Sequence, residues 1–221
     1  MTTAAARSRG PLAEPVARGR LARVAFAAAP VGVLVGWTVM RLGASRNPGA
    51  GWALAHSLWL VSYALFGVIV VELYRRIRTP GRSGKTVAVL GAAVAVAGIT
   101  AITGQMMVDL VIGLAASDRE QMHDLFQRAF DVPGVQLVLY GFGPGLLIVG
   151  LAALAIQLAA MRRISRATAV LALAGIVLIA VESATGGAVR LLVMPAGAGC
   201  LWLALNALSR ASMHAQAVLA E

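Results

Sequence analysis

The sequence predicts an all-α membrane protein, a bundle of six transmembrane helices with both termini in the cytoplasm. Three observations support this class. Hydrophobic residues make up 59% of the 221 residues and charged residues only 13%, about half the share in soluble domains. The apolar residues gather in six long stretches, and the basic residues gather between them.

The chain begins with a basic segment, residues 1–23, which holds five arginines and two prolines. It buries nothing, so a flexible cytoplasmic tail is expected. Six apolar segments follow, each close to the roughly 20 residues that cross a bilayer. They are residues 24–42, 52–73, 87–116, 135–160, 168–184 and 188–208. Residues 209–221 form a second cytoplasmic tail, and residues 24–208 form one transmembrane domain.

Orientation follows from the basic residues. Of the 19 lysines and arginines, 14 fall in the two tails and in the loops after the second and fourth segments. The other five, on the opposite side, are Arg41, Arg46, Arg119, Arg128 and Arg190. Because cytoplasmic loops carry the excess of Lys and Arg, both termini are predicted to be cytoplasmic, in the plasma membrane.

The only long non-cytoplasmic loop, residues 117–130, has apolar side chains at helical spacing and charged ones on the other face. This pattern predicts an amphipathic surface helix between the third and fourth spans. Ser117 with Glu120 fits a capping box at its start. The helix is interpreted either as a connector or as a lid over an opening on that side.

Two glycine patterns stand out. Gly32 and Gly36 form a GxxxG pair in the first span, which lets helix backbones approach closely. In the fourth span, Pro144 lies among Gly141, Gly143 and Gly145, which predicts a kink or an unwound stretch. That stretch serves either helix packing or the wall of a cavity.

Polar side chains collect in the non-cytoplasmic half of the predicted bundle, where such residues are costly and mark functional sites. They are His56, Gln105, Asp109, Gln136, Tyr140, Glu182 and Arg190. Asp109 lies about two turns inside the third span, with Gln105 on the same face. The alternative for His56, Glu182 and Arg190 is that they reach the membrane surface, where Glu182 pairs with Arg190.

Several classes of function are excluded. The net charge of +10 suggests nucleic acid, but the basic residues lie in short clusters between spans, so no nucleic-acid partner is predicted. The single cysteine, Cys200, excludes an intrachain disulfide or thiolate zinc site. No cofactor or metal is predicted. Met106, Met107 and Met194 with His56 could surround a copper ion, but methionine more often fills gaps in apolar packing.

The C-terminal half, with Met161-Arg162-Arg163 between two apolar segments, resembles uncharacterised six-helix membrane proteins of actinobacteria. In its size and its isolated intramembrane acids, the chain is also similar to the small integral-membrane terpene cyclases. That resemblance implies a carboxylic acid that protonates an alkene or an epoxide.

The sequence therefore predicts a membrane enzyme, a cyclase or isomerase, that uses proton transfer on a lipophilic, isoprenoid-like substrate. Asp109 or Glu182 is the expected acid and His56 its partner. The expected substrate-binding residues are Gln105, Gln136, Tyr140, Trp59 and Arg190. The alternatives are a proton-coupled transporter and a non-catalytic accessory protein. Membrane lipids and a second copy of the chain are the other candidate partners.

Overall fold

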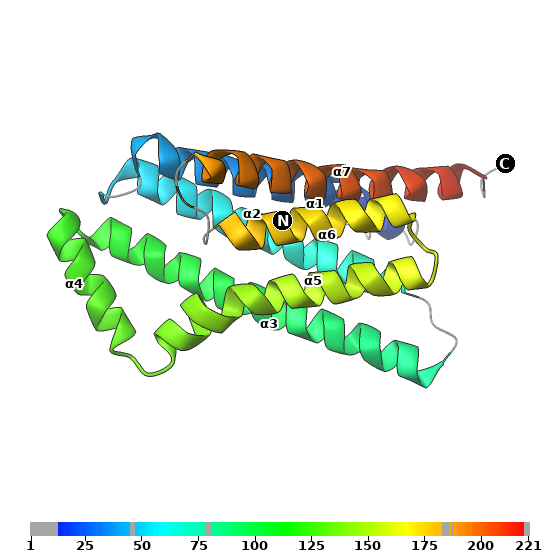
Figure 1. Ribbon diagram of the computed structural model, residues 1–221, viewed down its shortest axis with the longest axis horizontal. Helices are drawn as coiled ribbons and strands as arrows, with labels where there is room; N and C mark the ends of the chain where they lie inside the picture. The colour runs from blue at the N-terminus through cyan, green and yellow to red at the C-terminus, as the bar shows by residue number, and fades with distance from the viewer. Residues whose placement is uncertain (1–12, 45–46, 78–80, 183–185, 187, 219–221) are drawn as a thin grey trace, which may run out of the picture.

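The computed structural model describes residues 13–44, 47–77, 81–182, 186 and 188–218. This part of the chain is helical and contains no β-strand (Figure 1). Its elements are α1 (Ala13–Val39), the π-helix η1 (Met40–Ala44), α2 (Ala50–Arg76), α3 (Arg82–Ala115), α4 (Arg119–Phe130), the π-helix η2 (Val135–Phe142), α5 (Gly143–Ala160), α6 (Arg166–Val181) and α7 (Val189–Val218).

Six helices form a ring. Following the contacts around it, the order is α1, α2, α3, α5, α6, α7 and back to α1. The short helix α4 lies at one end of the bundle, and we call this end the α4 end (Figure 1). At the opposite end, which we call the terminal end, the chain passes from α2 to α3 and from α5 to α6.

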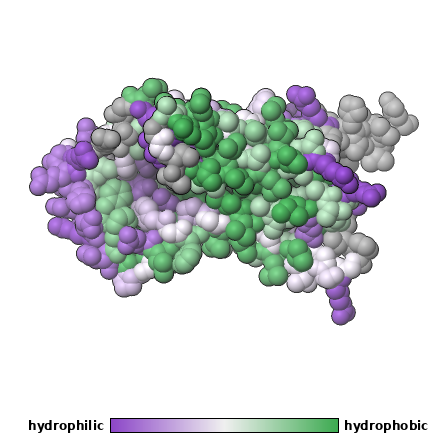
Figure 2. Space-filling model, viewed as in Figure 1, coloured by the Kyte–Doolittle hydropathy of each residue, from purple (hydrophilic) through white to green (hydrophobic). Residues whose placement is uncertain are grey.

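The exterior of the bundle suits lipid rather than water. Five segments are long and apolar enough to cross a membrane: Gly19–Leu42, Ala50–Arg76, Arg82–Ala115, Val135–Ala160 and Val189–Arg210. The sixth expected span corresponds to α6, an apolar helix of 16 residues. Large apolar side chains such as Val111, Leu192 and Leu203 are exposed. Figure 2 shows a green hydrophobic belt around the middle of the molecule, with purple hydrophilic side chains towards both ends.

The helix ends differ from the expected boundaries. The helix α1 begins at Ala13, within the segment expected to be a flexible tail, and α7 continues to Val218, past the expected end at residue 208. The first 12 residues and the last three lie outside the described part of the chain. The short connection between the fifth and sixth expected segments, residues 185–187, also falls mostly outside it.

The amphipathic surface helix is confirmed as α4. Its apolar face carries Met122 and Phe126, which pack against Trp52 of α2 and Ile112 of α3. The helix cap is at Asp118 and not at the predicted Ser117, because the Asp118 carboxylate accepts the backbone N–H of Gln121 at 2.9 Å. This hydrogen bond and one from the Ser117 hydroxyl favour the ionised form, which lowers the pKa of Asp118.

Small residues let neighbouring helices approach closely. A Cβ atom on Gly98 of α3 would lie 2.2 Å from the backbone N of Leu147 in α5, and one on Gly150 of α5 would lie 2.4 Å from the backbone N of Ala95. The predicted GxxxG pair acts in the same way: a Cβ atom on Gly32 would lie 2.2 Å from the Ser62 hydroxyl oxygen of α2. Close approach of this kind is a main source of helix association in lipid.

The kink predicted around Pro144 is present as the π-helix η2. The Gly143 N–H donates to the carbonyl of Val138, five residues back. The wider turn allows the helix to continue into α5 although Pro144 lacks an N–H donor. A Cβ atom on Gly143 would also lie 2.5 Å from the Cβ of Ala101, so this segment packs closely on α3.

The close contact between α3 and α5 predicts that a Gly→Ala change there destabilises the protein, whereas one at an open position does not. Gly98→Ala is expected to lower the free energy of unfolding by about 1–3 kcal/mol, as overpacking does. Gly67→Ala, in α2 with nothing within 4 Å of the added Cβ, is expected to be neutral or slightly stabilising. Thermal unfolding of the detergent-solubilised variants, followed by tryptophan fluorescence, measures both. Equal stability of Gly98→Ala and wild type would contradict this packing.

Candidate functional site

The first polar cluster at the α4 end is built around Asp109 of α3, and we call it the Asp109 cluster (Trp52, His56, Asp109, Tyr140). The Tyr140 hydroxyl of η2 donates to Asp109 Oδ1 at 2.5 Å. Nε2 of His56, from α2, lies 3.5 Å from Asp109 Oδ2. The Trp52 indole donates to the backbone carbonyl of Asp109 at 2.7 Å. Asp109 and His56 are only 6% and 2% exposed, so the cluster links three helices inside the protein.

The partners of His56 determine where its hydrogens lie. Nδ1 is 2.8 Å from the backbone carbonyl of Trp52, which only accepts, so Nδ1 carries a hydrogen. Nε2 faces the Asp109 carboxyl group. The two groups attract each other only when a hydrogen lies between them. His56 and Asp109 are thus two neighbouring titratable groups at the distance of an ion pair.

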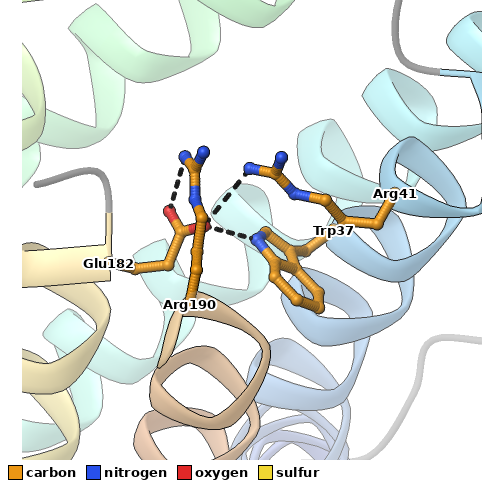
Figure 3. Close-up of polar contacts among 4 residues, drawn as sticks. All are labelled: Trp37, Arg41, Glu182 and Arg190. Atoms are coloured by element: carbon orange, nitrogen blue, oxygen red, sulfur yellow. Dashed lines mark hydrogen bonds and ion pairs between the residues drawn. The ribbon is translucent and has the colours of Figure 1, made fainter. Parts of the chain in front are cut away.

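The second polar cluster is built around Glu182, which directly follows α6, and we call it the Glu182 cluster (Trp37, Arg41, Glu182, Arg190; Figure 3). The Trp37 indole of α1 donates to Glu182 Oε1 at 2.7 Å. Arg190 of α7 donates through Nε to Oε1 and through Nη2 to Oε2, the latter at 3.4 Å. Arg41 of η1 approaches Oε1 at 3.4 Å and lies over the Trp37 ring.

A central cavity of about 540 Å³ lies inside the ring of helices. Its deeper walls are apolar and include Phe66, Leu151 and Leu201. Its polar end is formed by the Glu182 cluster, all four members of which line it. Two further polar side chains, the Tyr63 hydroxyl of α2 and the Gln105 amide of α3, line its walls.

Among the described residues, the sequence of helix contacts around the ring is interrupted near the α4 end. The helices α5 and α6 are in contact, but η2, which continues α5 towards the α4 end, contacts α3, α4 and α5 and not α6 among the described residues. Pro144 and Ile148 of α5 and Ile179 and Ala180 of α6 line the cavity at this place. Figure 1 shows η2 diverging from the end of α6 there. The cavity therefore lies beside a place where η2 and α6 make no contact among the described residues.

The terminal end of the bundle is packed more tightly. The space there measures only about 20 Å³ and has apolar walls that include Leu73, Leu158 and Leu208. All three of these leucines are buried in the main hydrophobic core. The central cavity therefore narrows towards the terminal end.

The predicted site residues fall into two groups, except Gln136, which belongs to neither. Glu182, Gln105, Trp59 and Arg190 line the central cavity. Asp109, His56 and Tyr140 form the buried Asp109 cluster and are not among the residues that line the cavity. Gln136 is exposed on η2. The Glu182–Arg190 ion pair that the sequence offered as an alternative is present.

Sequence reasoning missed two polar residues of the cavity, Arg41 and Tyr63. Arg41 served there only to assign orientation, although it follows Trp37 by four residues and thus shares its helix face. Tyr63 follows Trp59 by the same spacing. The signal that could have found both is this i, i+4 spacing from a tryptophan in a predicted span, Trp37 or Trp59.

Within the described residues, no three His, Cys, Asp or Glu side chains gather as a metal site would require. The chain matches no protein-family profile, no curated protein and no solved structure in the three comparisons. The two clusters and the cavity are therefore the features that bear on its chemistry.

The contacts of Asp109 with Tyr140 and His56 predict different effects for two changes at this residue. In Asp109→Asn, the amide oxygen accepts from Tyr140 and the amide nitrogen can donate to His56, so stability stays close to wild type. Asp109→Leu leaves both partners unsatisfied, at a cost of about 1–3 kcal/mol for buried His56 and a smaller cost for Tyr140, which is only partly buried. Thermal unfolding in detergent compares the two. If the leucine variant were as stable as the asparagine variant, these hydrogen bonds would not hold the cluster together.

Proposed function

We propose that all six ring helices cross the plasma membrane, with both termini in the cytoplasm. The helix α6 is short but lies in the ring beside α5 and α7. The basic residues support the orientation, because many occupy the terminal end. Those described there include Arg75, Arg76, Arg82, Lys85, Arg162, Arg163, Arg166 and Arg210. The α4 end then faces outwards.

In this membrane, the protein binds a lipophilic molecule in its central cavity. The cavity carries the proposal: its volume of about 540 Å³ lies within the roughly 300–1,000 Å³ of small-molecule sites. Most of its lining is apolar, and its charged groups sit together at one end. A molecule with a long apolar part and one polar end, such as an isoprenoid or an acyl lipid, matches this distribution.

A blind pocket fits the structure better than a transport path. A carrier needs polar groups that reach both membrane surfaces. Here the space at the terminal end is small and lined by buried leucines. The predicted proton-coupled transporter is therefore the weaker alternative.

Acid–base chemistry on the bound molecule, cyclisation or isomerisation, is the second candidate function. The proximity of His56 and Asp109 favours it, because an imidazole and a carboxyl group side by side can donate and accept protons. The His56 ring contacts Trp59 edge-on at 5.1 Å between centroids, and Trp59 lines the cavity. Glu182 is a poorer acid, since two arginines hold its carboxylate ionised.

One experiment tests both functions. Wild-type protein and three variants are expressed in cells fed with prenylated and polyene precursors, then purified, extracted and analysed by mass spectrometry. Ala180→Trp places a large side chain at the cavity wall, and it should retain at least tenfold less bound lipophile. Val177→Trp, on the same helix but 55% exposed and not among the lining residues, should match wild type. Asp109→Asn should still bind.

The outcomes separate the candidates. A new product isomeric with a fed precursor, present with wild type and absent with Asp109→Asn, would establish acid–base catalysis. Bound lipophile without any new product would leave binding alone, as in a non-catalytic accessory protein. Equal amounts of lipophile on wild type and Ala180→Trp would mean that the cavity is not the binding site.

A further inference from the structure

The polar end of the cavity has an excess of positive charge. Arg41, Glu182 and Arg190 are the charged residues that line the cavity in the described part of the chain, so two cations face one anion. Glu182 is 9% exposed, and its carboxylate already accepts from the Trp37 indole and from both arginines. One carboxylate cannot neutralise both guanidinium groups.

The arginines also keep hydrogen-bond donors that Glu182 does not use. A guanidinium group has five N–H donors in a planar fork. The bonds to Glu182 engage one nitrogen of Arg41 and two of Arg190. The Arg41 side chain is 37% exposed and that of Arg190 is 30% exposed, so their remaining donors are accessible where the cavity ends.

From this arrangement we infer that the molecule in the cavity carries an anionic head group, a phosphate or a carboxylate, that binds Arg41 and Arg190. The inference rests on the proposed function. Arginine forks suit such anions, because they donate parallel hydrogen bonds to two oxygens. Glu182 and Trp37 hold the two arginines in place for the head group. A cationic head would be repelled, and a neutral head would leave the positive charge uncompensated.

The chain of this ligand follows the apolar wall from the Glu182 cluster towards Phe66 and Leu201. A free anion would use only the arginines, whereas an amphiphile is concentrated in the bilayer by its chain and also fills the apolar part of the cavity. Such a chain enters from the lipid beside η2 and α6, which make no contact with each other among the described residues. The ligand class is thus a single-chain or isoprenoid anion taken from the membrane.

Chain-matched probes test this inference. Wild-type protein in phosphatidylcholine nanodiscs is titrated with radiolabelled hexadecyl phosphate, with radiolabelled 1-hexadecanol and with labelled inorganic phosphate, and empty nanodiscs give the background. Hexadecyl phosphate should bind at least tenfold more tightly than hexadecanol. Inorganic phosphate should bind at least a hundredfold more weakly than hexadecyl phosphate, because it has no chain that concentrates it in the bilayer and fills the apolar part of the cavity.

Variants assign the effect to the arginine. Arg41→Gln should lose about tenfold in affinity for hexadecyl phosphate and keep wild-type affinity for hexadecanol, which also shows that the variant is folded. Arg41→Lys should lose less. The control Arg128→Gln, at an exposed residue of α4 that does not line the cavity, should behave as wild type.

Each contrary result has one meaning. If hexadecanol binds as tightly as hexadecyl phosphate, or if Arg41→Gln binds both probes as wild type does, the head-group inference is wrong and the proposed cavity function survives. If neither hexadecyl probe binds above background, the proposed function fails as well. If inorganic phosphate binds as tightly as hexadecyl phosphate, the site is one for a free anion and not for a lipid.

Discussion

The organisation of the α4 end depends on one buried carboxylate, that of Glu182. It accepts hydrogen bonds from α1, η1 and α7 at once and so ties the end of α6 to three other elements. A buried charge costs several kcal/mol unless partners compensate it, and charge-assisted hydrogen bonds are the strong kind. The same cluster leaves the cavity with a polar, positively charged end. The Glu182 cluster therefore both joins the helices at this end and sets the charge that the proposed ligand would meet.

Hydropathy was enough to predict an all-helical chain, five helices long and apolar enough to cross a membrane, and the amphipathic helix α4. It could not give the helix ends, because helical propensity continues into polar segments, as at Ala13. It also could not show which helices pair. The contact of α3 with α5 depends on Gly98 and Gly150 meeting particular backbone atoms, and such matches are visible only in three dimensions.

The polar residues of the site were identified from depth in the membrane, and depth alone cannot separate two clusters at the same level. Asp109 and Glu182 both belong to the outer half. The first pairs with His56 and Tyr140, whereas the second lies at the cavity. What separates them is the direction in which each helix face points, which follows from ring order. Arg41 was overlooked because charge counting treats it as a surface residue, although its position after Trp37 places it at the cavity.

The central claim is that a membrane amphiphile occupies the space inside the helix ring. Methionine methyl groups report this directly by NMR, with ¹³C-methyl methionine in deuterated nanodiscs and protonated hexadecyl phosphate. Met106 and Met194 line the cavity, whereas Met122 is buried under α4 and Met107 is 55% exposed on the outside. We predict chain-to-methyl Overhauser effects at Met106 and Met194 and none at Met122. Effects at Met107 alone would place the amphiphile on the outer surface of the bundle and contradict the account.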